Sequence, residues 1–396
     1  MRVTRKGLAY WRRLRVLLLI PNLAPGGAES QLVHLALGLA AQGDEVTLAT
    51  LQRATRDREA LERAGVRVLE LRASDRAAKL RTLPRLIRLA RDADVVHCAL
   101  WDASLFGRLA ALAARTPVTV AEHSADRSMQ TSSSGAPRAE WIARHHRLLA
   151  PFTAATVACG RSQLALLDAE GVPRERVALV PNGVPVGKIR AEARAGGVRR
   201  PELGVPDDAL LVAHVGRLTP EKNQVATVEA VAALRARLGE IHVVFVGDGD
   251  DASAPARARE LGAGWAHFLG ARSDVPALLA LADLAVLPSV VETLPMAALE
   301  AMAAGVPQVV ADVGDLGTLM RESGAGISVP PGDTAALTAA CAVLLGEPGE
   351  RARLADRART AAPRWDVAVM VAGYVEVLAA AAERRPPPVS SNPWRS

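Results

Sequence analysis

Cysteine is scarce in this sequence. The three cysteines, Cys98, Cys159 and Cys341, are far apart and odd in number. They form neither a disulfide framework nor the spacing of a metal site. None lies in a motif that would activate a thiolate, so we interpret them as small buried hydrophobic residues rather than as nucleophiles.

Long apolar runs are also missing. No run reaches the ~18 residues that a membrane-spanning helix needs. The longest candidate, Val16–Ile20, is better explained as a buried strand. Residues 1–13 form a basic leader, but its apolar core is too short for a signal peptide and no small-residue cleavage site follows. We therefore expect a cytoplasmic protein.

Aromatic residues and lysine are rare as well. Aromatics are 3% of the chain, so no stacking platform for nucleic acid is visible. Only four lysines accompany 44 arginines. Residues 1–185 hold 27 basic and 17 acidic residues, a net charge of +10, and the remainder holds 21 and 25, a net charge of −4. The positive first half favours an anionic partner there, such as a membrane surface or a phosphorylated acceptor. Compositional bias toward arginine is the alternative explanation.

The chain of 396 residues, half of them apolar, is long enough for two α/β domains. Short β-branched or leucine-rich runs alternate with alanine- and leucine-rich helical segments, which indicates parallel strands joined by crossover helices. The predicted strands are 15–20, 45–51, 66–71, 94–98, 116–121, 155–158, 177–180, 210–215, 242–246, 266–269, 284–287, 308–311 and 326–329. The predicted helices are 31–42, 80–90, 105–114, 139–149, 223–238, 251–261, 275–281, 295–304, 334–345, 349–361 and about 367–383.

This alternation is interrupted once. Residues 184–206 contain Gly, Pro and Arg without a sustained apolar period. We therefore predict a first Rossmann-like domain over 14–185, a hinge over 186–206, a second Rossmann-like domain over 207–365, a C-terminal helix over 366–383 and a disordered tail over 384–396. Doubly wound domains bind ligands at the carboxyl ends of their strands, so two facing halves would leave a cleft between them.

The first candidate motif is Pro25-Gly26-Gly27-Ala28-Glu29, between the first strand and the first helix. Paired glycines allow backbone N–H groups to approach an oxygen-rich or phosphorylated ligand at a helix N-terminus. The motif is not GxGxxG, which removes the main support for a nicotinamide dinucleotide. A plain strand–helix turn explains it equally well.

The second motif, residues 215–223 (VGRLTPEKN), again joins a strand end to a helix start. Arg217 and Lys222 flank this loop, and Lys222 is informative because lysine is so rare here. A diphosphate leaving group needs such cations, since negative charge builds up on it as the glycosidic bond breaks.

The third motif is the strongest and runs from Ser289 to Pro307. Glu292 follows a strand, and Glu300 lies eight residues later on the next helix, about two turns in. The amides after Glu292 and the helix dipole favour an anion at the helix N-terminus. Glu300 is placed to accept hydrogen bonds from the hydroxyls of a ribose.

At these residues the sequence resembles glycosyltransferase family 4, the retaining GT-B enzymes. GGAE, VGRLTPEKN, VGDG, DVPALLALADLAVLPS, the Glu292…Glu300 pair and VPPGD occur in family order across roughly residues 14–380. The resemblance implies the α/β GT-B fold, with two Rossmann-like doubly wound domains facing across a cleft. It also implies a nucleotide-diphosphate sugar as the donor.

The resemblance also assigns roles. Arg217 and Lys222, after Gly216, would hold the donor diphosphate, and Glu300 would hold the ribose. Glu292 and the backbone from Thr293 through Leu294 and Pro295 to Met296 would hold the transferred sugar and phosphate. The nucleobase would lie near residues 270–274, where Arg272 is the charged residue. Gly26 and Gly27 would line the cleft from the first domain.

His123, in Glu122-His123-Ser124, corresponds to the histidine that the family carries at the end of a first-domain strand. The resemblance implies a hydrogen bond to the sugar or the reaction-centre backbone rather than conventional general-base catalysis. A satisfied core histidine is the alternative. We expect His97 to pack at a strand end and the His145/His146 pair to lie on a helix surface.

Two positions depart from the family pattern. Thr293 stands where many relatives have glycine, which predicts a narrower sugar pocket, and the run from Asp312 to Leu316 lacks the usual glutamate. The acidic run Asp248-Gly249-Asp250-Asp251 is better explained by turn chemistry than by metal binding. We therefore expect no metal and no cofactor besides the nucleotide-sugar co-substrate.

Basic stripes at residues 76–91 and 138–147 are compatible with two environments. Leu80, Leu83, Ile87 and Ala90 recur at helical spacing, so one face of the first stripe should pack on the sheet while the outward cations face solvent or anionic lipid headgroups. The sequence thus leaves peripheral membrane association open.

The functional hypothesis is a retaining glycosyltransferase that moves a sugar from a nucleotide-diphosphate donor to a lipid-linked or cell-surface glycan intermediate. Two alternatives remain at this stage. One is a sugar-nucleotide epimerase or hydrolase of the same fold. The other is a non-catalytic sugar-nucleotide-binding protein.

Overall fold

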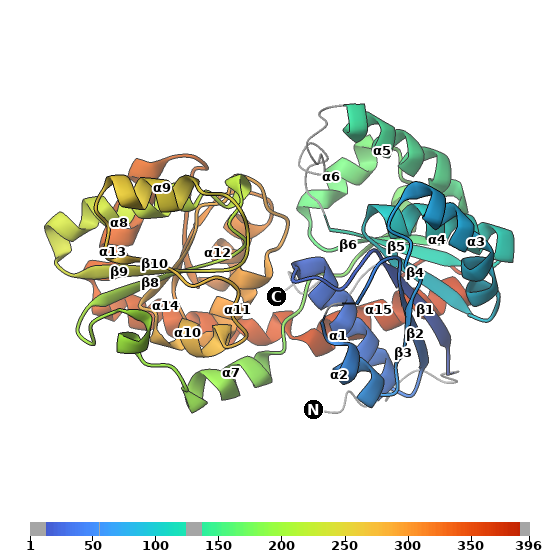
Figure 1. The fold of residues 1–396 in the computed structure, drawn as a ribbon, viewed down its shortest axis with the longest axis horizontal. Helices are drawn as coiled ribbons and strands as arrows, with labels where there is room; N and C mark the ends of the chain where they lie inside the picture. The colour runs from blue at the N-terminus through green and yellow to red at the C-terminus, as the bar shows by residue number, and fades with distance from the viewer. Residues whose placement is uncertain (1–12, 55, 124–136, 389–396) are drawn as a thin grey trace. The chain divides into compact units, whose positions relative to one another are not determined.

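The computed structural model describes residues 13–54, 56–123 and 137–388 (Figure 1). The predicted leader therefore lies outside the described residues except for Arg13, and so does the predicted tail from residue 389 onward. The chain divides into two compact units. The first contains the described residues up to Gly183 together with those from Val367 onward, and the second runs from Val184 to Asp366.

The first unit is built on a parallel seven-stranded sheet of order β3-β2-β1-β4-β5-β6-β7. Its strands read as nearly continuous apolar runs because helices cover both faces. Strand order reverses between β1 and β4, the mark of a doubly wound sheet. The strands are β1 Arg15–Ile20, β2 Glu45–Thr50, β3 Arg67–Glu70, β4 Val95–Ala99, β5 Val118–Glu122, β6 Ala155–Ala158 and β7 Val177–Leu179.

Helices α1 and α15 cover one face of this sheet, and α3 and α4 cover the other, each over its own apolar core. The helices of the unit are α1 Gly27–Ala41, α2 Arg58–Arg63, α3 Arg76–Arg91, α4 Trp101–Ala114, α5 Pro137–Leu149, α6 Ser162–Ala169 and α15 Val367–Ala382. Although α15 follows the second unit in the chain, its residues Tyr374 and Leu378 are buried in the first core.

The second unit repeats this plan with a parallel six-stranded sheet of order β10-β9-β8-β11-β12-β13. Its strands are β8 Leu210–Val215, β9 Ile241–Val246, β10 Ala266–Phe268, β11 Leu284–Leu287, β12 Gln308–Ala311 and β13 Gly326–Val329. Its helices are α7 Val186–Ala195, α8 Gln224–Leu238, α9 Ser253–Glu260, α10 Val275–Leu281, α11 Met296–Ala304, α12 Leu316–Ser323, α13 Thr334–Gly346 and α14 Pro348–Ala361. Strand order reverses between β8 and β11.

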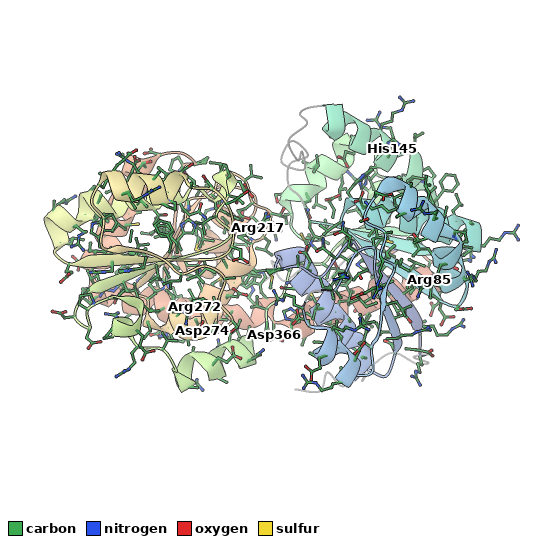
Figure 2. All side chains as sticks on the ribbon, in the orientation of Figure 1. Arg85, His145, Arg217, Arg272, Asp274 and Asp366 are labelled. Atoms are coloured by element: carbon green, nitrogen blue, oxygen red, sulfur yellow. The ribbon has the colours of Figure 1, made fainter. Side chains whose placement is uncertain are left out.

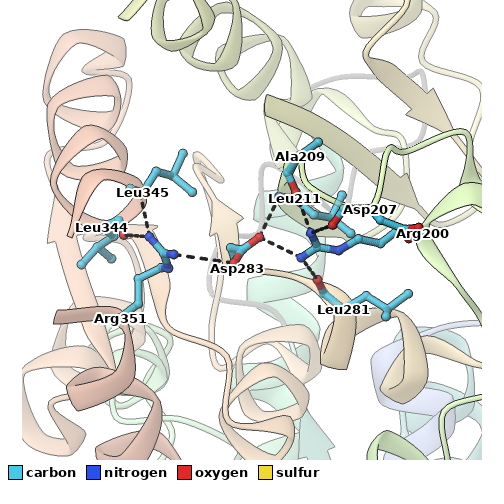
Figure 3. Close-up of polar contacts among 9 residues, drawn as sticks. All are labelled: Arg200, Asp207, Ala209, Leu211, Leu281, Asp283, Leu344, Leu345 and Arg351. Carbon is cyan, nitrogen blue, oxygen red and sulfur yellow. Dashed lines mark hydrogen bonds and ion pairs between the residues drawn. The ribbon is translucent and has the colours of Figure 1, made fainter. Parts of the chain in front are cut away.

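In both units an aspartate just before one central strand accepts a hydrogen bond from the backbone of the neighbouring central strand. Asp283, just before β11, accepts a hydrogen bond from the Leu211 backbone N–H at 2.9 Å. Asp94, just before β4, accepts one from the Arg15 backbone N–H, also at 2.9 Å. Asp283 additionally pairs with Arg200 at 2.9 Å and Arg351 at 3.8 Å, so it joins three segments of the second unit (Figure 3). This network lies at the edge opposite the carboxyl ends of the strands.

The predicted class, α/β with two doubly wound Rossmann-like domains, is confirmed, and all thirteen predicted strands exist. The irregular hinge predicted over 186–206 is not what the structure shows. Its first ten residues form α7, which packs on α10 and α11 of the second unit, and a 3-10 turn at Arg200–Leu203 follows. Val186 and Ile189 supply the buried face of α7, a signal too short to stand out in the sequence. The predicted C-terminal helix exists as α15.

The described residues agree with two further features of the sequence. All three cysteines are free and buried, and burial raises the pKa of the Cys98 and Cys341 thiols to about 12. Among the described helices, none is long and apolar enough to cross a bilayer.

Candidate functional site at the carboxyl edge of the second sheet

The strongest sequence motifs meet where the strand order of the second sheet reverses. The loop after β8 carries Arg217 and Lys222, and the loop after β11 carries Glu292. The two strands are neighbours, so their following loops leave the sheet side by side. In doubly wound folds this crevice at the switch point is where ligands bind.

The β8 loop has a defined shape. After Gly216 the chain makes a 3-10 turn over Pro220–Lys222, and α8 begins after Asn223, which adopts a left-handed conformation with φ 53°. The buried Gln224 side chain donates to the Arg217 carbonyl at 2.7 Å. Gln224 therefore closes the loop on itself, a role that the sequence motif did not reveal.

The β8 and β11 loops are bonded to each other through side chains. Lys222 Nζ lies 2.5 Å from Glu292 Oε1, and Ser289 Oγ donates to the same oxygen at 3.0 Å. The Glu292 side chain is 8% exposed and that of Lys222 is 18% exposed, so water screens this ion pair only weakly. The Ser289 side chain is fully buried beneath it. Ser289 was part of the quoted motif, but sequence reasoning gave it no role.

Backbone contacts reinforce this pairing. The Val290 N–H donates to the Glu221 carbonyl at 2.9 Å, and Asn223 Nδ2 donates to the Pro288 carbonyl at 3.3 Å. The position of Lys222 relative to Glu292 is therefore set by the main chain on both sides as well as by the ion pair.

Arg217 does not share the environment of Lys222. Its guanidinium pairs with Glu221 at 3.3 Å and its side chain is 62% exposed. We expected both cations to converge on one diphosphate. In this structure each cation pairs with a carboxylate of its own, although both belong to the loop between β8 and α8. An exposed pair of this kind contributes little stability, so a phosphate can displace Glu221 from Arg217 at small cost.

Two neighbouring loops support the site from either side, and each needs a glycine to come close enough. Gly249 has φ 147°, and a Cβ there would lie 2.1 Å from the Leu218 carbonyl oxygen. Gly314 has φ 54°, and a Cβ there would lie 2.1 Å from the Glu292 carbonyl oxygen. No other residue fits either position without moving a site loop. Residues 246–249 (VGDG) and residues 312–316 thus support the loops that carry Leu218 and Glu292.

The segment from Thr293 to Met296 leads into α11, as the sequence predicted. Thr293 and Leu294 are buried, and Pro295 occupies the N-cap position without a side chain that could cap the helix. The Pro295 side chain therefore caps none of the first amides of α11, and the helix dipole adds positive potential at this helix N-terminus. The Thr293 carbonyl accepts from the Asp315 N–H at 2.8 Å, which ties this segment to the loop after β12.

Glu300 is the fifth residue of α11, little more than one turn from the helix start rather than the two turns we expected. Its carboxylate makes no hydrogen bond or ion pair within the described residues. Burial raises the pKa of Glu300 to about 7. A shielded carboxylate with unused hydrogen-bonding capacity is a suitable acceptor for sugar hydroxyls.

Arg272 stands apart from the cations of the switch point. It follows β10, two strands from β8, and forms a two-bonded ion pair with Asp274 at 2.8 and 2.6 Å. Figure 2 shows these two side chains next to each other and away from Arg217. The Ala271 N–H donates to Asp248 at 3.2 Å, which places this loop on the same edge of the sheet.

In the acidic run that suggested a metal site, two aspartate side chains already accept hydrogen bonds from nearby backbone N–H groups. Besides Asp248, Asp251 accepts from the Ser253 N–H at 3.0 Å. Among the described residues, no cluster of three or more His, Cys, Asp or Glu side chains is arranged to hold a metal ion. The expectation that donor binding needs no metal stays a prediction.

The paired glycines of the first unit lie at the carboxyl end of β1, with α1 beginning at Gly27 and Gly26 at its N-cap. The Glu29 carboxylate folds back over this turn, since a Cβ on Gly26 would lie 2.2 Å from its Oε2. A carboxylate so near the helix N-terminus opposes a second anion there. This turn thus suits the hydroxyl groups of a neutral ligand better than a phosphate.

His123 follows β5 at the same edge of the first sheet. Its ring is half-buried, and desolvation lowers the pKa of His123 to about 4. The imidazole is therefore neutral near pH 7 and a weak base, which fits a hydrogen-bonding role. Its backbone N–H donates to Glu122 at 3.1 Å, and Gln163 donates to the Glu122 carbonyl at 2.9 Å.

The other histidines differ from our expectations in part. His97 is packed as expected, but it lies in the middle of β4, where its Nδ1 is 2.8 Å from Thr119 Oγ1, and burial lowers the pKa of His97 to about 3. The helix-surface interpretation is wrong for His146. Its side chain is 4% exposed, its Nε2 lies 3.9 Å from Glu122, and its ring contacts Trp101. The apolar residues around it in α5 gave no clear periodicity from which to place it.

Comparisons with known proteins agree with this geometry. Residues 25–188 match the family described as Glycosyltransferase Family 4, and residues 209–347 match the one described as Glycosyl transferases group 1. The chain is similar to D-inositol 3-phosphate glycosyltransferase of Salinispora arenicola, with 31% identity over 310 residues, 73% of this chain and 69% of that one. It is also similar to the enzyme of the same name from Geodermatophilus obscurus, with 31% identity over 74% of this chain and 69% of that one.

Solved structures show the same fold. The crystal structure of the Anabaena protein HepE in complex with UDP-glucose superposes with a TM-score of 0.80 over 93% of this chain and 100% of that chain, at 22% identity. The lipopolysaccharide glycosyltransferase WaaG gives a TM-score of 0.70 over 92% of this chain and 99% of that chain, at 18% identity.

Proposed function

The chain belongs to glycosyltransferase family 4 and is a glycosyltransferase of the GT-B type, and we propose that it transfers a sugar from a nucleoside-diphosphate donor to an acceptor hydroxyl with retention of the anomeric configuration. The observation that carries this proposal is the switch point of the second sheet. There a shielded lysine and a carboxylate lie on two adjacent loops, and the second of these loops leads into the N-terminus of α11.

In the proposed reaction the bond between the anomeric carbon and the diphosphate oxygen breaks, and its electron pair leaves with the diphosphate. Lys222, Arg217 and the first amides of α11 stabilise the negative charge that develops there. The acceptor oxygen bonds to the anomeric carbon on the face that the diphosphate leaves. The proton of the acceptor hydroxyl passes to a diphosphate oxygen, so the reaction needs no additional base. This is consistent with the low pKa of His123.

Glu292 would contact the sugar rather than the proton in transfer. Its Oε1 already accepts from Lys222 and Ser289. The other carboxylate oxygen, Oε2, would accept from hydroxyls of the transferred sugar. Glu300 would receive the ribose hydroxyls. The first unit, through Gly26, Gly27 and His123, would take the acceptor.

For the donor we propose a uridine diphosphate sugar as the first candidate, because the similar Anabaena structure holds UDP-glucose. For the acceptor, D-inositol 3-phosphate stands in the names of two relatives. The Glu29 carboxylate over the α1 turn argues instead for an acceptor that is neutral at this turn, such as the terminal sugar of a lipid-linked intermediate.

The test is a panel of nucleotide sugars scored by thermal shift, followed by product analysis. A donor that binds only the folded protein raises its melting temperature. With the selected donor and a panel of acceptors that includes D-inositol 3-phosphate, the expected product is a glycoside with the anomeric configuration of the donor. An inverted product would refute retention. Free sugar or an epimer, with no glycoside from any acceptor, would refute transfer.

A further inference from the structure

The outward side of α3 carries a row of cations. Arg81, Arg85, Arg88 and Arg91 are all exposed and recur at helical spacing. The opposite side of the helix packs on the sheet through Leu86 and Ala90, with Leu83 and Ile87 partly buried beside them. We name the exposed side, consisting of these four arginines together with Leu80 and Pro84, the α3 basic face (Arg85 is labelled in Figure 2).

The arginines of the α3 basic face have no acidic partners in the part of the chain that the structure describes. None of the four makes a hydrogen bond or ion pair with any described residue. Lys79, the remaining described cation of the helix, faces another way and pairs with Asp102 of α4 at 2.6 Å. No acidic residue occurs between Asp75, the N-cap, and Asp92, the C-cap.

Helix α14 of the second unit shows that this arrangement does not simply follow from an arginine-rich composition. It also carries four arginines, but Glu350 and Asp356 within the same helix pair with Arg353 and Arg359. Arg351 of α14 faces Asp283. Carboxylates therefore neutralise three of the four arginines of α14, whereas the four arginines of the α3 basic face stay available to an external anion.

Apolar side chains interrupt the row of cations. Leu80 is 53% exposed, and Pro84 is exposed one turn further along. Helix α4 packs beside α3 and adds Leu109 and Leu112, which are 36% and 48% exposed. Leucines among arginines fit a surface with charged headgroups above an apolar interior, because arginine stems extend along apolar material while their guanidinium groups stay with the headgroups.

We propose that the α3 basic face docks the protein on an anionic lipid bilayer. A soluble polyanion would be held by the arginines alone and would gain nothing from Leu80, whereas a bilayer uses both. Docking would use the surface of α3 and none of the residues assigned to sugar transfer.

The test is co-sedimentation of the full chain with vesicles of phosphatidylcholine alone and of phosphatidylcholine containing phosphatidylglycerol. The protein should bind the anionic vesicles and not the neutral ones, and added salt should weaken binding. Replacing Arg81 and Arg85 together by glutamine should reduce binding about 25-fold, at about fivefold for each arginine near an anionic surface. The matched control is the double change Arg353→Gln and Arg357→Gln on α14, which removes the same charge and should leave binding unchanged.

A second pair of variants separates a bilayer from a soluble polyanion. Leu80→Ser should weaken vesicle binding, whereas Val343→Ser, at a comparably exposed position on α13, should not. Melting temperatures within a few degrees of the parent protein would show that each variant is folded. Equal binding to neutral and anionic vesicles would overturn the proposal, and so would equal losses in the two arginine pairs. Strong binding to a soluble polyanion with no effect of Leu80→Ser would overturn it in favour of that partner.

Discussion

The Lys222 ammonium group lies 2.5 Å from Glu292 Oε1, and these residues are 70 positions apart on loops that follow adjacent strands. The pair is mostly shielded from water. Glu292 therefore fixes the lysine against the loop that leads into α11, which begins at Met296. In the proposed reaction, a positive charge fixed in this way would be organised in advance for a diphosphate and would not need to reorganise.

Removing the Lys222 charge should disable turnover. Lys222→Ala should remove roughly 2–4 kcal/mol of transition-state stabilisation. The value of kcat/KM for the donor should therefore fall about 30- to 1,000-fold. The measurement is steady-state transfer with the donor selected by thermal shift. Lys188→Ala is the matched control, because Lys188 is an exposed lysine that pairs only with Glu192 on α7. Near-normal turnover of Lys222→Ala would refute the role assigned to Lys222.

Ser289 should act by orienting Glu292. It donates to Glu292 Oε1 at 3.0 Å, which leaves Oε2 as the oxygen that is presented to the sugar. Ser289→Ala removes one hydrogen bond to a charged group, so kcat should fall about tenfold while KM for the donor changes little.

The conservative variant separates orientation from folding. Ser289→Thr keeps the hydroxyl and should recover most of the lost kcat, and Ser253→Ala, which removes an exposed hydroxyl bonded to Asp251, should have no effect. A rise in KM with unchanged kcat would contradict orientation of Glu292.

Much of this organisation could be read from the sequence. Strands such as β8, β11, β12 and β13 begin and end where they were predicted, because buried parallel strands are short apolar runs bounded by Gly, Pro or Asp. Their alternation with helices then determines the doubly wound class. The resemblance to glycosyltransferase family 4 implied that Lys222 and Glu292 both serve the donor, but only the structure shows that the strands before them, β8 and β11, are neighbours.

What the sequence could not show depends on contacts between distant residues. The docking of α15 on the first unit rests on the packing of Val371 against Gly38 of α1, and no local pattern records such a pair. The burial of His146 follows from its position behind Trp101 and Glu122. The pairing of Arg217 with Glu221, rather than with the group that Lys222 contacts, depends on side-chain geometry that the loop sequence does not record.

Asp283 should matter for stability and not for activity. It joins Arg200, Arg351 and the Leu211 N–H at the amino edge, far from the site (Figure 3). Asp283→Ala would leave two partly buried cations without their carboxylate partner and the Leu211 amide without its side-chain acceptor, which should cost about 2–3 kcal/mol and lower the melting temperature by about 5–10 °C. KM for the donor, measured well below the transition, should stay unchanged.

The neighbouring Asp207 supplies the control for this change. Its backbone carbonyl accepts from Arg200, whereas its carboxylate takes no part in the network, so Asp207→Ala should leave the melting temperature within a degree or two of the parent. Equal melting temperatures for the Asp283 and Asp207 variants would show that the Asp283 carboxylate contributes nothing to the stability of the folded chain.

Glu300 should impose a pH dependence on donor binding. Burial raises its pKa to about 7, so the carboxyl becomes charged as the pH rises through neutrality. A charged carboxylate accepts stronger hydrogen bonds from ribose hydroxyls than a protonated one. Donor affinity should therefore rise between about pH 6 and pH 8, and the titration should disappear in Glu300→Gln.

The same carboxylate should act in the opposite direction on stability. Its pKa is higher in the folded chain than in the unfolded chain, so the folded chain binds more protons between the two values. The free energy of unfolding must therefore fall as the pH rises from about 4.5 to 7. At pH 8, Glu300→Gln should stabilise the protein without donor by on the order of 2 kcal/mol while it weakens donor binding. Urea unfolding and donor titration of both proteins at pH 6 and pH 8 measure the two effects. A variant that loses stability at pH 8 would show that Glu300 has structural partners, whereas one that gains stability and keeps its donor affinity would remove Glu300 from the binding site.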